Sequence, residues 1–331
     1  MLNVVLVGFG WWGQHIARRL NGHARFNILC VVEPDTALHG AILGQGLEVE
    51  TDYGSAIDRD GVEAVILTSP NHLHDIQIVE AVARGLHVFC EKPLSLSAEK
   101  ARASVRSCQE AGLVLGIGHE RRWEPAVERL KSMLDDGALG TIMHAELAFS
   151  HNKLAGLPAG SWRTSRAFAP AAGMTQMGIH LTDMLIWFFG KVATVSAVTA
   201  DRSLGWETGD VVSVQLQFES GITATLQAIL NTPHFIRTHV FGTAAWVEIR
   251  NATHPDTPGG KSEMEVYRSL DDTDLLTFDW TDSVMANLDA FAAAVHGQAD
   301  YPYSAFELVH NIEVLDAIVR SAEHRQVVRL A

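Results

Sequence analysis

A glycine-rich turn directly behind the first apolar run of the chain constrains the fold more than any other feature. The run Leu2–Val7 predicts a buried β-strand, and the pattern Gly-x-Gly-x-x-Gly follows it at once. In a strand–turn–helix unit that binds a dinucleotide, the first glycine permits the tight turn. The second lets the backbone approach a pyrophosphate at the helix N-terminus, and the third lets the helix pack on the strand. The sequence therefore predicts a dinucleotide site formed by Gly8, Phe9, Gly10, Trp11, Trp12 and Gly13.

An acidic residue, Glu33, lies at the position where a dinucleotide site requires a carboxylate. Glu33 ends the second predicted strand, Asn27–Glu33, and follows Gly13 by 20 residues. At this distance an acidic side chain accepts hydrogen bonds from the adenine ribose hydroxyls. A 2′-phosphate would meet like charge there, and Pro34 and Asp35 offer no arginine to receive it. The predicted cofactor is therefore NAD, and the alternative for Glu33 is a solvated charge at a strand end.

Short apolar runs alternate with amphipathic segments as far as about Gly118. Further strands are predicted at Ala64–Thr68, Leu86–Cys90 and Val114–Ile117, and helices at Gln14–Leu20, Asp75–Arg84 and Ala98–Ala111. Ile76, Val79 and Ala83 are expected on one apolar face of the second helix, and Ser97 is the expected cap of the third. Apolar strands separated by crossovers predict a doubly wound parallel sheet, an α/β domain over residues 1–120.

The pattern changes in the second part of the chain, residues 121–331, which we expect to form an α+β domain with a large, mainly antiparallel open sheet. Its predicted strands are Thr141–Ser150, Val192–Thr199, Val211–Phe218, Ile222–Leu230, His239–Arg250 and Glu263–Ser269. Its predicted helices are Pro125–Asp136, Met177–Phe189, Asp282–His296 and Ser304–Ser321. Polar and apolar residues alternate from Val214 to Glu219, as in a sheet with one wet face, and Glu219–Ile222 predicts a hairpin turn.

Two segments at predicted strand ends carry polar side chains. Ligands of open parallel sheets bind beyond the carboxyl ends of the strands, so both segments are expected at the cofactor crevice. The predicted contacts are Thr68, Ser69, Pro70, Asn71, His74, Glu91 and Lys92. Lys92, next to a proline at a strand end, is placed to hydrogen-bond a substrate hydroxyl and to stabilise the alkoxide that forms as hydride leaves. The alternative is a solvated surface lysine.

Four segments together resemble the glucose–fructose oxidoreductase/inositol dehydrogenase/MocA (Gfo/Idh/MocA) family. They are Gly8–Gly13, Thr68–His74, Glu91–Pro93 and Gly173–Asp183, and the match runs nearly the whole chain. The resemblance implies an N-terminal Rossmann domain followed by the α+β domain. It also implies nicotinamide-dependent oxidation or reduction of a hydroxyl on a sugar, polyol or related compound. It further implies that Lys92 polarises the hydroxyl and that His180 is the acid/base, with a structural core histidine as the alternative for His180.

Position 176 departs from the family pattern. Many family dehydrogenases carry an aspartate four residues before the histidine, whereas this chain has Gln176. A glutamine one helical turn before His180 supplies a hydrogen bond to the ring or to the substrate but no negative charge. Asp183 follows His180 on the same predicted helix face and is a further substrate candidate, with a structural helix carboxylate as the alternative. His151 and Arg163 are candidates by analogy with family members, with surface loops as the alternative.

Composition excludes several other classes of protein. The net charge is −14 and no run is rich in Lys or Arg, which argues against a nucleic-acid or anionic-membrane partner. Cys30, Cys90 and Cys108 show no framework spacing and predict reduced, buried thiols in a cytoplasmic protein. No signal peptide and no run of about 18 apolar residues is evident. The histidines form no H-x-x-x-H or H-E-x-x-H pair, so no metal site is predicted.

Two functions follow from these observations. The first is an NAD-dependent oxidoreductase that acts on a secondary hydroxyl of a small carbohydrate or polyol. The second is a non-catalytic protein that binds NAD and senses nucleotide on the same fold. In either case the open sheet of the second domain predicts a homodimer or homotetramer that associates through the sheet face.

Overall fold

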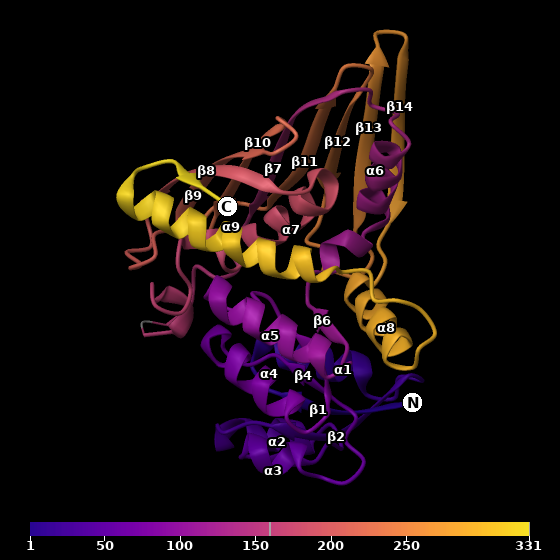
Figure 1. The fold of residues 1–331 in the computed structure, drawn as a ribbon, viewed down its shortest axis with the longest axis vertical. Coiled ribbons are helices and arrows are strands. Elements are labelled where there is room, and N and C mark those ends of the chain that lie inside the picture. The colour runs from indigo at the N-terminus through magenta and orange to yellow at the C-terminus, as the bar shows by residue number, and fades with distance from the viewer. Residues whose placement is uncertain (159, 331) are drawn as a thin grey trace. The chain divides into compact units, whose positions relative to one another are not determined.

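The computed structural model of the protein describes residues 1–158 and 160–330, and the chain forms two compact units (Figure 1). The first unit contains Met1–His119 and Val284–Ile312, and the second contains Glu120–Ser283 and the segment from Glu313 on. Sequence reasoning assigned Val284–Ile312 to the second domain. In the structure this segment packs with the N-terminal sheet.

Over the described residues, the first unit is built on a six-stranded sheet whose neighbouring strands are all parallel. Its order is β3-β2-β1-β4-β5-β6, so the direction of winding reverses between β1 and β4. The strands are β1 (Leu2–Val7), β2 (Phe26–Val32), β3 (Val49–Glu50), β4 (Ala64–Leu67), β5 (His87–Cys90) and β6 (Leu115–Ile117). The helices are α1 (Trp11–Leu20), α2 (His39–Leu43), α3 (Tyr53–Ile57), α4 (His74–Val82), α5 (Ala98–Glu110) and α8 (Ser283–Val295). The predicted doubly wound α/β fold is confirmed.

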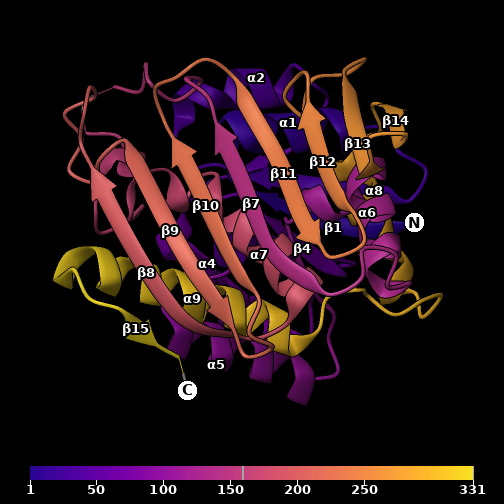
Figure 2. The same cartoon turned by 90° about the horizontal axis from the view of Figure 1, so that it is seen from above.

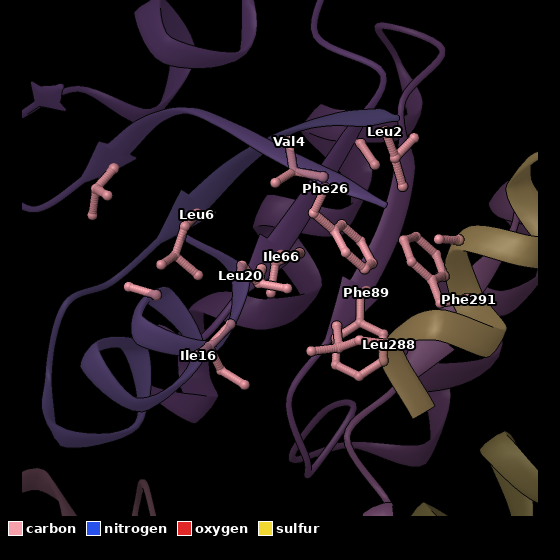
Figure 3. Packing of buried hydrophobic residues seen from close by; sticks show 14 of the residues in the cluster. Leu2, Val4, Leu6, Ile16, Leu20, Phe26, Ile66, Phe89, Leu288 and Phe291 are labelled. Atoms are coloured by element: carbon pink, nitrogen blue, oxygen red, sulfur yellow. The ribbon is translucent and has the colours of Figure 1, made fainter. Parts of the chain in front are cut away.

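Apolar side chains of the sheet and of α8 share one core (Figure 3). Phe89 from β5 and Phe291 from α8 meet edge to face, with ring centroids 5.6 Å apart. A Cβ at Gly116 would lie 2.7 Å from the Phe89 ring and 2.8 Å from the Phe291 ring, so only glycine fits between them. This packing explains why α8 belongs to the first unit although it lies far along the chain.

Three details of the first unit differ from the sequence prediction. Helix α1 begins at Trp11, directly behind Gly10, and not at Gln14. The short elements β3, α2 and α3 were not predicted. The expected apolar face of α4 is wrong: Ile76 and Val79 are 55% and 52% exposed, because polar side chains of this helix are buried instead. The predicted cap at Ser97 is confirmed, since its side chain accepts from the backbone N–H of Lys100.

Within the described residues, the second unit is built on a nine-stranded sheet of order β14-β13-β12-β11-β7-β10-β9-β8-β15 (Figure 2). The strands are β7 (Ile142–Ser150), β8 (Val192–Ala200), β9 (Val211–Phe218), β10 (Thr223–Ile229), β11 (Phe235–Gly242), β12 (Trp246–Asn251), β13 (Lys261–Ser269), β14 (Asp272–Asp279) and β15 (Val328–Arg329). The pair β7–β10 is parallel and the other neighbours are antiparallel. The mainly antiparallel sheet is therefore confirmed.

Helices α6 (Pro125–Asp135), α7 (Gly178–Phe189) and the C-terminal part of α9 (Ala305–His324) belong to the second unit. Helix α7 packs on β7 and β10, and Ser321 of α9 accepts a hydrogen bond from the backbone N–H of Ala197 in β8. The predicted alternation in β9 is confirmed, because its residues from Val212 on are buried and exposed in turn. These helices cover the buried face of the sheet.

Two predictions about the second unit are corrected. His239–Arg250 is not one strand but parts of β11 and β12, because the N–H of Gly242 bonds to the carbonyl of Ala245 and closes a turn. Strand β14 was not predicted, since Asp272–Asp279 is exposed along almost its whole length and carries no clear apolar alternation.

Two further findings concern the whole described chain. In that part of the chain, no helix is both long and apolar enough to cross a membrane. Cys30, Cys90 and Cys108 are buried and free of disulfides, as expected.

Candidate functional site

The glycine turn after β1 contains glycines with different physical roles. Gly8 has φ +93°, and a Cβ there would lie 3.0 Å from backbone atoms of Thr68 and Ser69. At Gly13 a Cβ would lie 2.1 Å from the carbonyl oxygen of Gly8, closer than any real contact. At Gly10 a Cβ would meet nothing within 4 Å. Gly8 and Gly13 are therefore required by the chain itself, whereas Gly10 faces open space.

The first turn of α1 lies at this open space. Gly10 is its N-cap and offers no side-chain acceptor, and no acidic residue lies in the first turn. The first N–H groups of a helix have no partner inside the helix and attract anions. Trp11, which is 62% exposed, and Trp12 form a ring cluster with His15 beside this helix end. The turn has the open backbone that a pyrophosphate requires.

Glu33 connects the glycine turn to the end of β2. Its carboxylate accepts the backbone N–H of Phe9 at 2.7 Å and that of Asp35 at 2.9 Å, and the side chain is only 8% exposed. The N–H of Gly8 also bonds to the carbonyl of Val32, the last residue of β2. Glu33 thus lies next to the turn, as its spacing predicts, and it holds the turn in place besides any role toward a ribose.

His74 joins the two predicted strand-end segments. It is fully buried, with Nδ1 2.8 Å from the carbonyl oxygen of Pro93 and Nε2 3.0 Å from that of Ser69. Burial lowers the pKa of His74, and the two backbone contacts only partly offset this. The ring is therefore neutral at neutral pH and carries a single N–H for two carbonyls.

Neighbouring side chains extend this arrangement. Gln77, one turn after His74 on α4, accepts a hydrogen bond from the Ser69 hydroxyl. The Thr68 hydroxyl lies 2.9 Å from the carbonyl oxygens of both Val7 and Gly8. These contacts explain why polar residues of α4 are buried.

The remaining predicted cofactor contacts lie beside these segments. Asn71 and Glu91 are buried, whereas Pro70 is half-buried. A Glu91 carboxylate oxygen accepts from the N–H of Lys92 at 3.3 Å. A Cβ at Gly118 would lie 2.4 Å from the same carboxyl group, so that side chain fills the space above this glycine. Hydrogen bonds of Thr68 and His74 therefore join the glycine turn and the two strand-end segments.

In the second unit, His180 lies on α7 and is 3% exposed. Its Nε2 is 3.8 Å from Oε1 of Glu120, which belongs to the 3₁₀ turn Glu120–Trp123. Sequence reasoning did not identify Glu120. Nothing in the spacing of the two residues, 60 positions apart, indicates that they meet.

Three of the sequence-predicted substrate residues have well-defined partners in the second unit. The Asp183 carboxylate forms a bidentate ion pair with the guanidinium of Arg122, at 2.6 and 2.8 Å, and both side chains are buried. Gln176 donates from Nε2 to the carbonyl oxygen of Arg163 at 2.9 Å. The Arg163 guanidinium lies 4.1 Å from the centroid of the Trp162 ring, and burial lowers its pKa.

His151 lies near a second imidazole, that of His254. The Phe149 ring contacts the rings of His151, His180 and His254, at centroid distances of 5.7, 6.1 and 5.5 Å. Burial lowers the pKa of His151 to about 4 and also lowers that of His254, whose Nδ1 is 3.1 Å from the Asp256 carboxylate. His254 and Asp256 were not predicted as site residues, because they lie in an irregular loop without a motif.

A metal centre has no support in the part of the chain that the structure describes. There, no group of three or more His, Cys, Asp or Glu side chains is arranged to hold an ion.

The chain is similar to known oxidoreductases in both units. Residues 2–119 match the family described as "Oxidoreductase family, NAD-binding Rossmann fold", and residues 127–248 match the "GFO/IDH/MocA C-terminal domain". D-xylose 1-dehydrogenase (NADP(+)) 2 of Haloferax volcanii is 31% identical over 306 residues, which is 91% of each chain. Levoglucosan dehydrogenase, solved with NADH and levoglucosan, has the same fold, with a TM-score of 0.84 at 22% identity over 99% of each chain.

Another relative matches over a shorter part. A 2,7-anhydro-N-acetylneuraminate hydratase of Mediterraneibacter gnavus is 29% identical over 230 residues. This match covers 67% of the present chain and 60% of the hydratase, so the chain spans less than two thirds of that relative's length.

Replacing His74 by alanine should destabilise the protein, because the carbonyls of Ser69 and Pro93 lose a buried donor. An unsatisfied buried polar group costs about 1–3 kcal/mol, and urea unfolding should show a loss of this size. His296→Ala, which changes an exposed histidine, is the matched control and should leave the free energy of unfolding nearly unchanged. Equal stability of His74→Ala and the unaltered protein would contradict the bridging role.

Proposed function

The chain belongs to the Gfo/Idh/MocA family of oxidoreductases with an NAD-binding Rossmann fold, and on this premise we propose that it transfers hydride between NAD and a secondary hydroxyl of a sugar, polyol or sugar derivative. The observation that carries this proposal is the glycine turn, whose middle glycine faces open space next to the buried Glu33. The dehydrogenase names of the xylose and levoglucosan relatives support the substrate class.

In the proposed mechanism, bound NAD supplies the hydride acceptor at nicotinamide C4. Lys92 donates a hydrogen bond to the substrate hydroxyl oxygen and stabilises the negative charge that develops on it. The His180 imidazole accepts the hydroxyl proton as the carbinol hydrogen leaves with its electron pair. The products are a carbonyl compound, an imidazolium and the reduced cofactor, and the reverse reaction returns the proton from His180.

We propose that the chain uses NAD in preference to NADP. The carboxylate of Glu33 would accept hydrogen bonds from the ribose diol and would repel a 2′-phosphate. Pro34 and Asp35 follow Glu33, and the Asp35 side chain caps the next turn, so they provide no positive charge for that phosphate. The Haloferax relative is named for NADP(+), so this preference must be tested on the chain itself.

For cofactor binding, Gly10→Val should abolish the binding of both nucleotides while the fold survives, because the new side chain enters the open space. Glu33→Ala should weaken NAD and reduce the discrimination against NADP. Calorimetric titration with each nucleotide measures both effects, and Glu99→Ala, an exposed carboxylate on α5, should bind like the unaltered protein. Tighter binding of NADP than of NAD by the unaltered protein would refute the preference.

For catalysis, Lys92→Ala and His180→Ala should each lower kcat by about 10²- to 10⁴-fold, the usual contribution of one acid/base group. NADH formation with a panel of polyols, aldoses and sugar acids measures this. His180→Ala should still bind NAD, since the glycine turn and Glu33 are unaltered. Near-normal turnover in His180→Ala would remove this residue from the mechanism.

The second candidate function is a non-catalytic sensor of NAD. The uncharged Gln176, whose amide is bonded to the Arg163 carbonyl, favours this alternative. The same substrate panel separates the two functions. A sensor would bind NAD and form no NADH with any compound, whereas the retained Lys92 and His180 support turnover.

We also propose that the chain forms a homodimer or homotetramer through the wet face of its nine-stranded sheet. Trp246 and Tyr267 stack there with centroids 5.0 Å apart, and Val198 is 66% exposed on the same face. Such apolar groups on a sheet face favour association. Light scattering should give the mass of two or four chains, and a monomeric mass would refute the proposal.

A further inference from the structure

The carboxylate of Glu120 lies next to His180, although the sequence motif that contains His180 does not include this residue. Many family dehydrogenases carry an aspartate four residues before the histidine, and this chain has Gln176 there. Glu120, from a different element, has its Oε1 3.8 Å from His180 Nε2. We propose that Glu120 is the positioning residue that orients the His180 imidazole and stabilises its protonated form, in place of an aspartate at position 176. This inference rests on the proposed function of His180 as the acid/base.

Burial makes the interaction between Glu120 and His180 effective. Their side chains are only 9% and 4% exposed, respectively. Charges removed from water interact more strongly, because less solvent screens them. A carboxylate within about 4–6 Å favours the protonated form of an imidazole. Glu120 therefore has both the distance and the surroundings to act on the His180 ring.

Gln176 is poorly placed to take this role. The sequence argument assumed that Gln176 and His180 lie one helical turn apart, but α7 begins only at Gly178. Gln176 lies in the preceding turn, where its Nε2 donates to the carbonyl of Arg163. Its hydrogen bond therefore fastens the loop in front of α7, and its side chain carries no charge in any case.

The arginines that follow Glu120 in the sequence are bound to other carboxylates. Arg121 Nε lies 2.8 Å from Glu124, and Arg122 forms its bidentate pair with Asp183, three residues after His180. Each of these buried pairs has no net charge. Glu120, in contrast, lies in ion-pair range of the His180 ring.

Further titratable groups near His180 come from β7 and from the loop after β12. His151 and His254 reach it through the Phe149 ring, and burial lowers the pKa of both, so they are neutral at neutral pH. Asp256, whose carboxylate lies 3.1 Å from the neutral His254 ring, keeps its negative charge. The Arg121 guanidinium lies 4.9 Å from the Phe149 centroid and is paired with Glu124. Glu120 differs from these groups because its carboxylate lies 3.8 Å from the His180 ring itself, whereas they reach His180 only through the Phe149 ring.

The proposed role of Glu120 is defined by the transfer of a proton between the substrate and His180. During oxidation the substrate hydroxyl gives its proton to neutral His180, which becomes an imidazolium beside the Glu120 carboxylate. During reduction the same proton returns to the forming hydroxyl. Glu120 neither gains nor loses a proton in either direction, and it lowers the energy of the charged ring.

The direct test does not require turnover. Histidine-labelled protein without cofactor is titrated by NMR, and the His180 signal is assigned by its loss in His180→Gln. In Glu120→Gln the titration midpoint of His180 should fall by about one pH unit, the size expected on removal of a nearby opposite charge. Glu219→Gln, the same chemical change at an exposed carboxylate paired with Lys191, should leave it unchanged.

Two further variants make the test specific. Gln176→Ala should shift the midpoint less than Glu120→Gln, and Glu120→Asp, which keeps the charge, should give a midpoint between those of the unaltered protein and Glu120→Gln. An unchanged midpoint in Glu120→Gln would overturn the inference. A larger shift in Gln176→Ala, or a midpoint in Glu120→Asp below that in Glu120→Gln, would also overturn it. If Glu120→Gln does not fold, Glu120→Asp and Gln176→Ala still decide the question by the order of their midpoints.

Kinetics separate this inference from the proposed function. If the unaltered protein oxidises a compound of the panel, Glu120→Gln should lower kcat about tenfold, which corresponds to one pH unit, and the dissociation constant for NAD should stay within about twofold. If the unaltered protein turns over nothing, the proposed function fails, while the NMR titration still tests the pairing of Glu120 with His180. Normal kcat in Glu120→Gln with an active unaltered enzyme would overturn the inference alone.

Discussion

The predicted cofactor site of the first unit depends on the close approach of helix α1 to the turn after β1. No Cβ fits at Gly13, where the Gly8 carbonyl lies in the way, and this contact fixes the helix end relative to the sheet. The other strand-end segments are built onto it by buried hydrogen bonds. The Thr68 hydroxyl reaches the turn, and His74 reaches both Ser69 and Pro93. The predicted cofactor contacts are therefore held in position by hydrogen bonds between side chains and backbone groups.

The fold of the first unit could be predicted because its strands are buried on both faces and read as apolar runs. Glu33 could be found by its fixed offset from the glycine turn. The buried face of α4 could not be found, since a rule that assigns apolar residues to the core misplaces His74 and Gln77, which are buried to bond with backbone and hydroxyl groups. For α8, periodicity indicates a helix but not the sheet it packs on; that is decided by its tertiary contacts, among them the one between Phe291 and Phe89.

The candidate site of the second unit shows a similar limit. His180 is identified by its motif, whereas Glu120 and His254 come from distant segments with no periodic pattern, and their proximity arises only from the tertiary fold. Asp183 was recognised as a residue of the right helix, but its partner Arg122 could not be read from the sequence. The motif therefore locates His180, whereas the charged side chains near it come from other segments of the chain.

The single N–H of the His74 ring has a consequence for the two loops that it bridges. Because neutral imidazole exists as two tautomers, its proton lies on Nδ1 toward Pro93 or on Nε2 toward Ser69, and the two carbonyls compete for it. A change that draws the Ser69 carbonyl away favours the Nδ1 tautomer and tightens the bond to Pro93, next to Lys92. The His74 ring thus couples the two loops: a change that weakens its hydrogen bond to one loop strengthens its hydrogen bond to the other.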